Sequence, residues 1–354
     1  MTTPTEDRHR YPVLDSLRGL AALSVLLTHT LQRIVPPGVL NHTPIRMLVD
    51  GRCFVIFFFV LSGFVLATAL WNQAGKLPYI LYVARRLVRL YPPYAAAGVL
   101  AIASLRLSGG DWNLAKLRDY LLTLGTTQGT AINIPSWSLA YELHLSLLMP
   151  LTCLLIARNA RLFAWAVAAL FLLVEICILK MGLTQFPYAA DDLPAALIVT
   201  LRFAICFAVG ALLAWIHLRR SWFFPVVVRH PFVAALAACV LMSVLLDQTS
   251  LLGAAVVIML SLQWPAMQAV MAFRPFVWLG RISYSLYLTH FIVLEFVVHA
   301  LDGRVSLPVS VTIAFLAAFA IAWIFHRLVE APAIGLSRRI GRSPPIRSPS
   351  PSAG

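Results

Sequence analysis

The stretch LDSLRGLAALSVLLTHT, residues 14–30, has the length and apolar character of a membrane-spanning helix, yet it carries Asp15, Arg18 and His29. Ionisable side chains inside a bilayer are costly unless they face the protein interior or a wet cavity. On a helix, Arg18 and His29 lie about 20° apart around the axis, and Asp15 falls on nearly the same side. We therefore predict a membrane helix whose polar stripe faces other helices.

The composition of the whole chain points to the same class of protein. Of its 354 residues, 60% are hydrophobic and 12% are charged, and its mean hydropathy is +0.83. A soluble domain of this length must show far more polar surface to water. We predict an all-α fold, a polytopic membrane helix bundle of about ten transmembrane helices. The predicted spans are residues 13–34, 53–72, 91–107, 137–157, 162–180, 194–217, 232–247, 250–272, 282–301 and 307–328.

Lysine and arginine are unevenly distributed between the two sides of this predicted bundle. With the N-terminus in the cytoplasm, eighteen of the 28 lie in cytoplasmic segments, eight lie on the opposite side, and Arg18 and Arg202 lie within spans. This is the positive-inside bias, so we predict both termini inside and a multi-pass protein of the inner (cytoplasmic) membrane. Topology explains the net charge of +14, and we expect no nucleic-acid partner.

The sequence divides into a membrane domain, residues 11–332, and a cytoplasmic tail, residues 337–354. The tail is basic and rich in Ser and Pro, a composition typical of disorder. The outward segment 108–136 is a candidate cover for the mouth of a pocket. Five cysteines are scattered without a C-x-x-C pair, so we interpret them as packing residues and expect no metal site.

A group of three arginines, Arg85, Arg86 and Arg89, occurs in YVARRLVRLYPPY, residues 82–94. This basic cluster has two interpretations that its spacing alone does not separate. It is either an ordinary cytoplasmic anchor that obeys the charge bias, or a site for phosphate groups, which arginine binds in bidentate fashion.

Two further spans carry polar stripes. Ser138, Glu142 and Ser146 recur every fourth residue in the fourth span, so they share one helix face. A structural ion pair is one explanation for the glutamate, but no lysine lies nearby, so we favour a functional role.

The second stripe lies in LGRISYSLYLTHF, residues 279–291. Ser283, Tyr287 and His290 follow helical spacing there, and either substrate binding or hydrogen bonds between helices would explain them. On the predicted topology, His29 lies roughly 16 Å beyond Arg18, in the outer half of the membrane with Glu142.

The chain resembles the membrane acyltransferase 3 family in an ordered set of motifs: LDSLRGLAALSVLLTH, FFFVLSGF, RRLVRLYPPY, WSLAYE, LGRISYSLYLTH and VEAP. The resemblance covers nearly the whole chain. It implies an O-acyltransferase that moves an acyl group, expected to be acetyl, from acyl-CoA to a hydroxyl of an extracytoplasmic carbohydrate or small molecule. Acyl-CoA is then a co-substrate, and no bound cofactor is implied.

Carried over by position, the resemblance assigns Arg18 and His29 to the Arg–His pair of the family and Glu142 to its membrane glutamate. The basic cluster matches the family's basic motif and would hold the phosphates of CoA. His29 would act as general base on the acceptor hydroxyl or as an acyl-accepting nucleophile, with Glu142 orienting it. Many members carry a second acidic residue after this glutamate, where this chain has Leu143.

The same polar groups suit a second class of protein, a transporter or flippase for a lipid-linked sugar or other polar solute. Many transporters are built from repeated halves, and no internal repeat is visible here, which weakens this alternative. A purely structural membrane protein is a third possibility, but it leaves the polar stripes unexplained.

The charge bias gives a direct test of topology. A reporter fused after Ser337 should report a cytoplasmic location, because the basic segments are retained on that side. Alkaline phosphatase, active only outside the cytoplasm, should be inactive at this position. An active fusion would contradict the predicted orientation and the depth assigned to His29.

Overall fold

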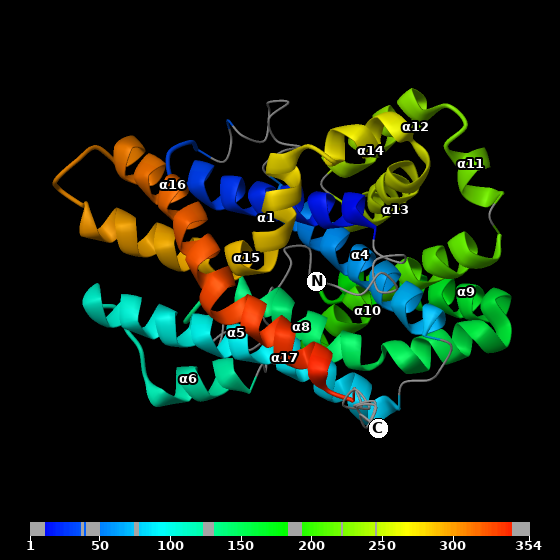
Figure 1. Cartoon of the computed structure of the whole chain (residues 1–354), viewed down its shortest axis with the longest axis horizontal. Helices are drawn as coiled ribbons and strands as arrows, with labels where there is room; N and C mark the ends of the chain where they lie inside the picture. The colour runs from blue at the N-terminus through cyan, green and yellow to red at the C-terminus, as the bar shows by residue number, and fades with distance from the viewer. Residues whose placement is uncertain are drawn as a thin grey trace, which may run out of the picture.

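The computed structural model is helical throughout the part of the chain that it describes, residues 11–36, 39, 50–73, 78–122, 131–182, 193–220, 222–244 and 246–341 (Figure 1). The helices are α1 (Pro12–Leu31), α4 (Gly51–Asn72), α5 (Tyr79–Leu107), α6 (Leu114–Leu121), α8 (Ser136–Leu147), α9 (Met149–Lys180), α10 (Leu193–Arg219), α11 (Phe223–Val227), α12 (Pro231–Ser243), α13 (Asp247–Gln263), α14 (Pro265–Met271), α15 (Arg274–Ala300), α16 (Leu307–Phe325), the π-helix η2 (His326–Glu330) and α17 (Ala331–Arg339). The predicted all-α class is confirmed for these residues.

Within this part of the chain, six helices are long and apolar enough to cross a membrane, or seven if the bent pair α13 and α14 forms one span. The protein is therefore an integral, multi-pass membrane protein. Helix α1 is not among the six, because the polar residues of its stripe lower its hydropathy. The count of ten spans and the placement of both termini inside stay predictions.

Two predicted boundaries differ from the helices observed. The predicted spans 137–157 and 162–180 are separated at residues 158–161, whereas helix α9 continues through these residues with a kink at Asn159. The side chain of Asn159 accepts a hydrogen bond from the backbone N–H of Leu162. Helix α5 starts at Tyr79 instead of residue 91 and contains Pro92 and Pro93 in its interior. The basic cluster consequently lies on the same helix as the predicted third span.

Helices α1 and α15 touch backbone to backbone. A Cβ atom added at Gly19 would lie 2.5 Å from the backbone N of Gly280, and one added at Gly280 would lie 2.5 Å from the carbonyl oxygen of Asp15. Ten residues further along each helix, the rings of His29 and His290 stack. The two helices therefore run in the same direction, as expected of the predicted first and ninth spans.

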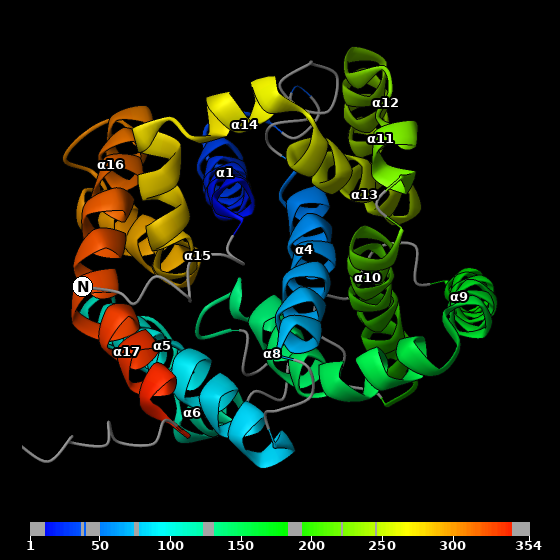
Figure 2. The ribbon, with the colours of Figure 1, turned by 45° about the vertical axis from the view of Figure 1, so that its right-hand side comes forward.

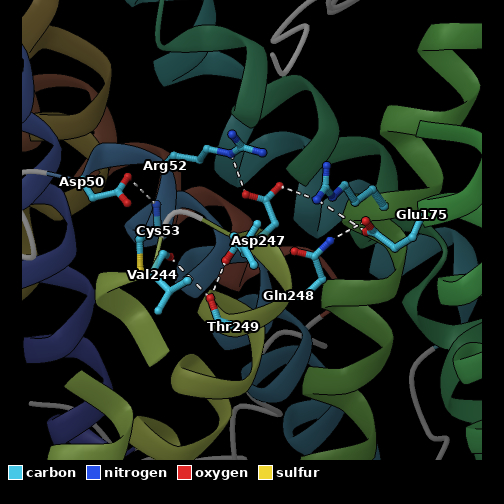
Figure 3. Close-up of polar contacts among 10 residues, drawn as sticks. Asp50, Arg52, Cys53, Glu175, Val244, Asp247, Gln248 and Thr249 are labelled. Carbon is cyan, nitrogen blue, oxygen red and sulfur yellow. Dashed lines mark hydrogen bonds and ion pairs between the residues drawn. The ribbon is translucent and has the colours of Figure 1, made fainter. Parts of the chain in front are cut away.

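A network of buried charges joins α4, α9, α10 and α13 (Figure 3). Asp247 pairs with Arg52 at 2.6 Å and with Arg202 at 3.1 Å, while Arg202 also lies 3.5 Å from Glu175. Gln248 donates a hydrogen bond to Glu175. Two arginines and two carboxylates balance in charge, so the network accounts for Arg202 within a predicted span as a structural group.

The end of the chain returns to the start of α5. Helices α16, η2 and α17 follow one another and bring α17 against α5 (Figures 1 and 2). Arg85 donates a hydrogen bond from Nε to the carbonyl oxygen of Ile340 at 3.0 Å. The predicted tail, 337–354, thus begins inside α17, and its residues 342–354 lie outside the described part of the chain.

The contact between α1 and α15 gives a prediction about stability. Gly280→Ala should destabilise the protein by about 1–3 kcal/mol, because the new methyl group must push the two backbones apart. Gly335→Ala is the matched control, since a Cβ added there meets no atom within 4 Å and alanine is a better helix former than glycine. Thermal unfolding in detergent should show a lower midpoint for Gly280→Ala only. Equal midpoints would contradict the observed packing.

Candidate active site

A cavity of about 1220 Å³ opens between α1, α4, α5, α8, α15, η2 and α17. In Figure 2, α4 lies on one side of this region and α15 and α17 lie on the other. Helix α4 lines the cavity from Val55 to Asn72, which at 1.5 Å per residue is roughly 26 Å, most of the thickness of a hydrocarbon core of about 30 Å. The cavity is therefore a deep shaft along α4.

Arginine dominates the charged lining of the shaft. The arginines that line it are Arg18 of α1, Arg85, Arg86 and Arg89 of α5, Arg281 of α15 and Arg338 of α17. Three carboxylates, Asp15, Glu142 and Glu330, line it as well. Six cations against three anions leave an excess of positive charge, which favours an anionic occupant.

Most of the carboxylate charge is engaged with groups other than arginine. Glu142 accepts a hydrogen bond from Ser62 at 3.1 Å. Glu330 accepts one from Ser285 at 2.5 Å and contacts His326 Nδ1 at 2.9 Å. Among the ion pairs of the described residues, Asp15 is the one shaft carboxylate that pairs with a shaft arginine, Arg18, at 3.3 Å. These contacts leave guanidinium groups available for a ligand.

The arginines retain donors that no group in the described part of the chain uses. Arg86 donates from Nε to the hydroxyl of Ser146, while its Nη2 is buried without a hydrogen-bond partner. No hydrogen bond or ion pair with another described residue is made by Arg89, Arg281 or Arg338. A buried donor without a partner is costly, so a bound anion would stabilise this arrangement.

The deep end of the shaft is formed by hydroxyl groups and aromatic rings. The hydroxyls of Ser138 and Tyr287 lie 2.7 Å apart, and both residues line the cavity. The ring of Tyr287 contacts that of Phe58 edge to face on one side, at 5.7 Å between centroids, and that of His290 on the other, at 5.8 Å. Tyr287 therefore lies between the shaft and the histidines.

His29, which is partly buried, and His290, which is fully buried, form a pair beyond this end. Their rings stack with centroids 5.4 Å apart, and Phe291 packs edge-on against His29. His290 Nδ1 lies 3.0 and 2.8 Å from the carbonyl oxygens of Leu286 and Tyr287. Two acceptors require Nδ1 to carry the proton in the neutral ring, so Nε2 presents a lone pair. This Nε2 is buried and has no partner among the described groups.

The structure brings most of the residues singled out in the sequence to one place. Those lining the shaft are Arg18, Arg85, Arg86, Arg89, Ser138, Glu142, Ser283 and Tyr287. His29 and His290 are not among its described lining residues, and they lie together about one helical turn past Tyr287. The expected contact between Glu142 and His29 is not observed in the described residues, because Glu142 bonds to Ser62.

Several lining residues are not part of the site predicted from the sequence. Arg281 and Arg338 belong to the eighteen basic residues of the predicted cytoplasmic segments, and Tyr284, His326 and Glu330 have no predicted role in the site, although all five line the cavity. The position of Arg281, directly before the stripe of Ser283, was a usable signal. Within the residues that the structure describes, no group of three or more His, Cys, Asp or Glu side chains is placed to hold a metal ion.

Two comparisons with known proteins agree with each other. Residues 11–327 match the family model described as an acyltransferase domain. The chain is also similar to the protein named acyltransferase MdmB of Streptomyces mycarofaciens, with 28% identity over 385 aligned positions that cover 97% of this chain and 96% of MdmB. No solved structure matches the chain.

Proposed function

The chain belongs to the acyltransferase family whose model matches residues 11–327, and from this premise we propose that it transfers an acyl group, expected to be acetyl, from acyl-CoA to a hydroxyl of a carbohydrate or small molecule. The family and the similarity to MdmB make it an acyltransferase for groups other than amino-acyl groups. One observation carries the finer proposal: the arginine-lined shaft leads from one end of the bundle to within a turn of the stacked pair of His29 and His290.

The donor enters the shaft with its phosphates among the arginines. The 3′,5′-ADP part of CoA is the multiply charged end of the molecule, and guanidinium groups bind phosphate through paired, charge-assisted hydrogen bonds. The pantetheine arm is slender and largely uncharged, and it follows α4 towards Ser62, Ser138 and Tyr287. The thioester then lies at the deep end, next to the hydroxyl pair.

The reaction joins the acceptor oxygen to the thioester carbon. The acceptor hydroxyl attacks the carbonyl carbon, a C–O bond forms, the C–S bond breaks, and the hydroxyl proton passes through a neutral imidazole to the CoA thiolate. His29 is the proposed base, and an acyl group held transiently on His29 is the variant of the same chemistry. The Tyr287 hydroxyl is the proposed donor of a hydrogen bond to the developing oxyanion; Ser138 Oγ, 2.7 Å away, donates its own proton to the carbonyl oxygen of Pro135 and holds the Tyr287 hydroxyl in place.

The two substrates reach the site from opposite ends of the bundle. With both termini in the cytoplasm and ten spans, the arginines of the shaft lie at the cytoplasmic side of the inner membrane, where acyl-CoA is made, and the histidines lie towards the acceptor. Glu142 accepts a hydrogen bond from Ser62 and makes no direct contact with His29 among the described residues. Its effect on the His29 imidazole is therefore limited to the electric field of its charge.

His29→Gln tests the catalytic role of the imidazole. Glutamine keeps hydrogen-bonding capacity but cannot accept a proton at neutral pH, so acyl transfer should fall by about 10²–10⁴-fold. The measurement is acetyl-CoA consumption by purified protein with an acceptor-containing glycan fraction, together with mass spectrometry of the acylated product. Expression and binding of CoA should be unchanged.

The same assay separates the enzyme from a transporter. Near wild-type turnover by His29→Gln would remove His29 from the mechanism. Wild-type protein that leaves acetyl-CoA intact, and whose loss leaves surface and secreted glycans unchanged in mass, would contradict acyl transfer from CoA and favour a permeation role for the polar groups.

Tyr287→Phe tests the proposed oxyanion donor. The substitution keeps the ring contacts with Phe58 and His290 and removes only the hydroxyl, so kcat should fall by about 10²-fold or more with little change in the KM for acyl-CoA. Tyr284→Phe is the matched control, because Tyr284 also lines the shaft but donates its hydroxyl to the carbonyl oxygen of Leu90. Equal kcat values for the two variants would rule out a special role for the Tyr287 hydroxyl.

A further inference from the structure

The last helix of the described chain contributes an arginine to the shaft. Ile334, Gly335 and Arg338 of α17 line the cavity, whereas Arg339, the next residue, does not. Both arginines are exposed. Arg338 makes no hydrogen bond or ion pair with any described residue. Its guanidinium group is therefore available to whatever occupies the mouth.

Contacts between α17 and α5 fix the depth of Arg338. The hydrogen bond from Arg85 to the carbonyl oxygen of Ile340 attaches the end of α17 to the first turns of α5. Gly341 follows with a φ of +71°, and a Cβ there would lie 2.9 Å from Leu81. Arg338 thus lies at the level of Arg85, at the mouth of the shaft.

From the mouth inward, the polar groups of the shaft follow one another in a defined order. Arg89 is one turn beyond Arg85 on α5, roughly 6 Å further in. Glu142 with Ser62 comes next, and the pair of Ser138 and Tyr287 closes the deep end. Acyl-CoA presents its groups in the same sequence: the 3′-phosphate on the ribose, the pyrophosphate, the pantetheine arm and the thioester. When the thioester lies at Tyr287, the outermost phosphate lies at the mouth.

The excess of arginine also bears on the class of donor. A phosphopantetheine arm attached to a carrier protein has a single phosphodiester, whereas CoA adds a second phosphate in its pyrophosphate and a 3′-phosphate that alone carries about two negative charges. The lining has six arginines and three carboxylates, so it carries a net positive charge. A donor with one phosphodiester would leave most of this charge uncompensated. Free acyl-CoA compensates it.

We propose that Arg338 binds the 3′-phosphate of CoA and that α17 thereby selects free acyl-CoA over donors that lack this phosphate. The proposal rests on the proposed function, in which acyl-CoA is the donor. The basic cluster then binds the pyrophosphate. The two arginine groups have separate tasks: the cluster holds any CoA-like donor, and Arg338 discriminates.

Equilibrium binding tests the proposal without knowledge of the acceptor. Purified full-length protein in detergent is titrated with CoA and with 3′-dephospho-CoA. Wild-type protein should bind CoA about tenfold more tightly or better, the scale of one charge-assisted hydrogen bond. Arg338→Ala should bind the two ligands equally, with unchanged affinity for dephospho-CoA. Arg338→Lys should recover part of the preference, because it keeps the charge and loses the planar fork.

Two control variants make the result specific. Arg339→Ala changes the same charge on the same helix outside the cavity, so it should keep the wild-type preference for CoA. Arg86→Ala should weaken both ligands by a similar factor and keep the preference. An Arg338→Ala protein that still prefers CoA, or that loses affinity for both ligands equally, would contradict the proposed role of Arg338. Neither result would contradict the proposed function. Wild-type protein that binds neither ligand would contradict the donor itself, and with it the proposed function.

Discussion

The close backbone contact between α1 and α15 is the constraint on which the candidate site depends. Gly19 and Gly280 lie against each other because neither has a side chain, and the helices run in the same direction from this point. Equal intervals of ten residues then bring His29 opposite His290. On the other side of the contact, Asp15 and its partner Arg18 lie next to the start of α15. One pair of glycines thus sets the register of both ends of the site.

The shaft carries an excess of positive charge without any ligand bound. Its carboxylates bond mainly to hydroxyl and imidazole groups, such as Ser62 with Glu142 and Ser285 with Glu330. Carboxylates bonded in this way keep their charge but form no direct ion pair with the guanidinium groups, so three of the six arginine charges of the described lining stay in excess. Positive charge therefore accumulates at one end of the shaft, while the other end carries only neutral hydroxyls and rings. Such polarity matches a ligand whose charge is concentrated at one end.

Helical periodicity was enough to predict which residues share a face. Ser138, Glu142 and Ser146 do lie on one side of α8, where each contacts a different helix: α15 through Tyr287, α4 through Ser62 and α5 through Arg86. Partners across helices could not be read from the sequence, because spacing says nothing about which helices pack together. For this reason the hydrogen bond of Glu142 with Ser62, the stacking of the two histidines and the return of α17 to α5 came only from the structure. The hydropathy pattern did place a break at residues 158–161, where α9 is kinked at Asn159, but it could not show that one helix continues through the break.

The end of the described shaft lining at Ser138 and Tyr287, short of His29 and His290, has an electrical consequence for the proposed site. A water-filled cavity takes the potential of the solution to which it opens, so the membrane voltage falls mainly across the layer beyond Tyr287 and not over the full hydrocarbon thickness of about 30 Å. A unit charge that crosses the whole voltage exchanges about 2.3 kcal/mol per 100 mV with the field. In the proposed topology, an anion that enters the shaft from its open end crosses little of this field, and a proton displaced at His29 and His290 crosses more of it. For the proposed function, the membrane voltage is therefore expected to act more on proton movement at the histidines than on donor binding at the arginines.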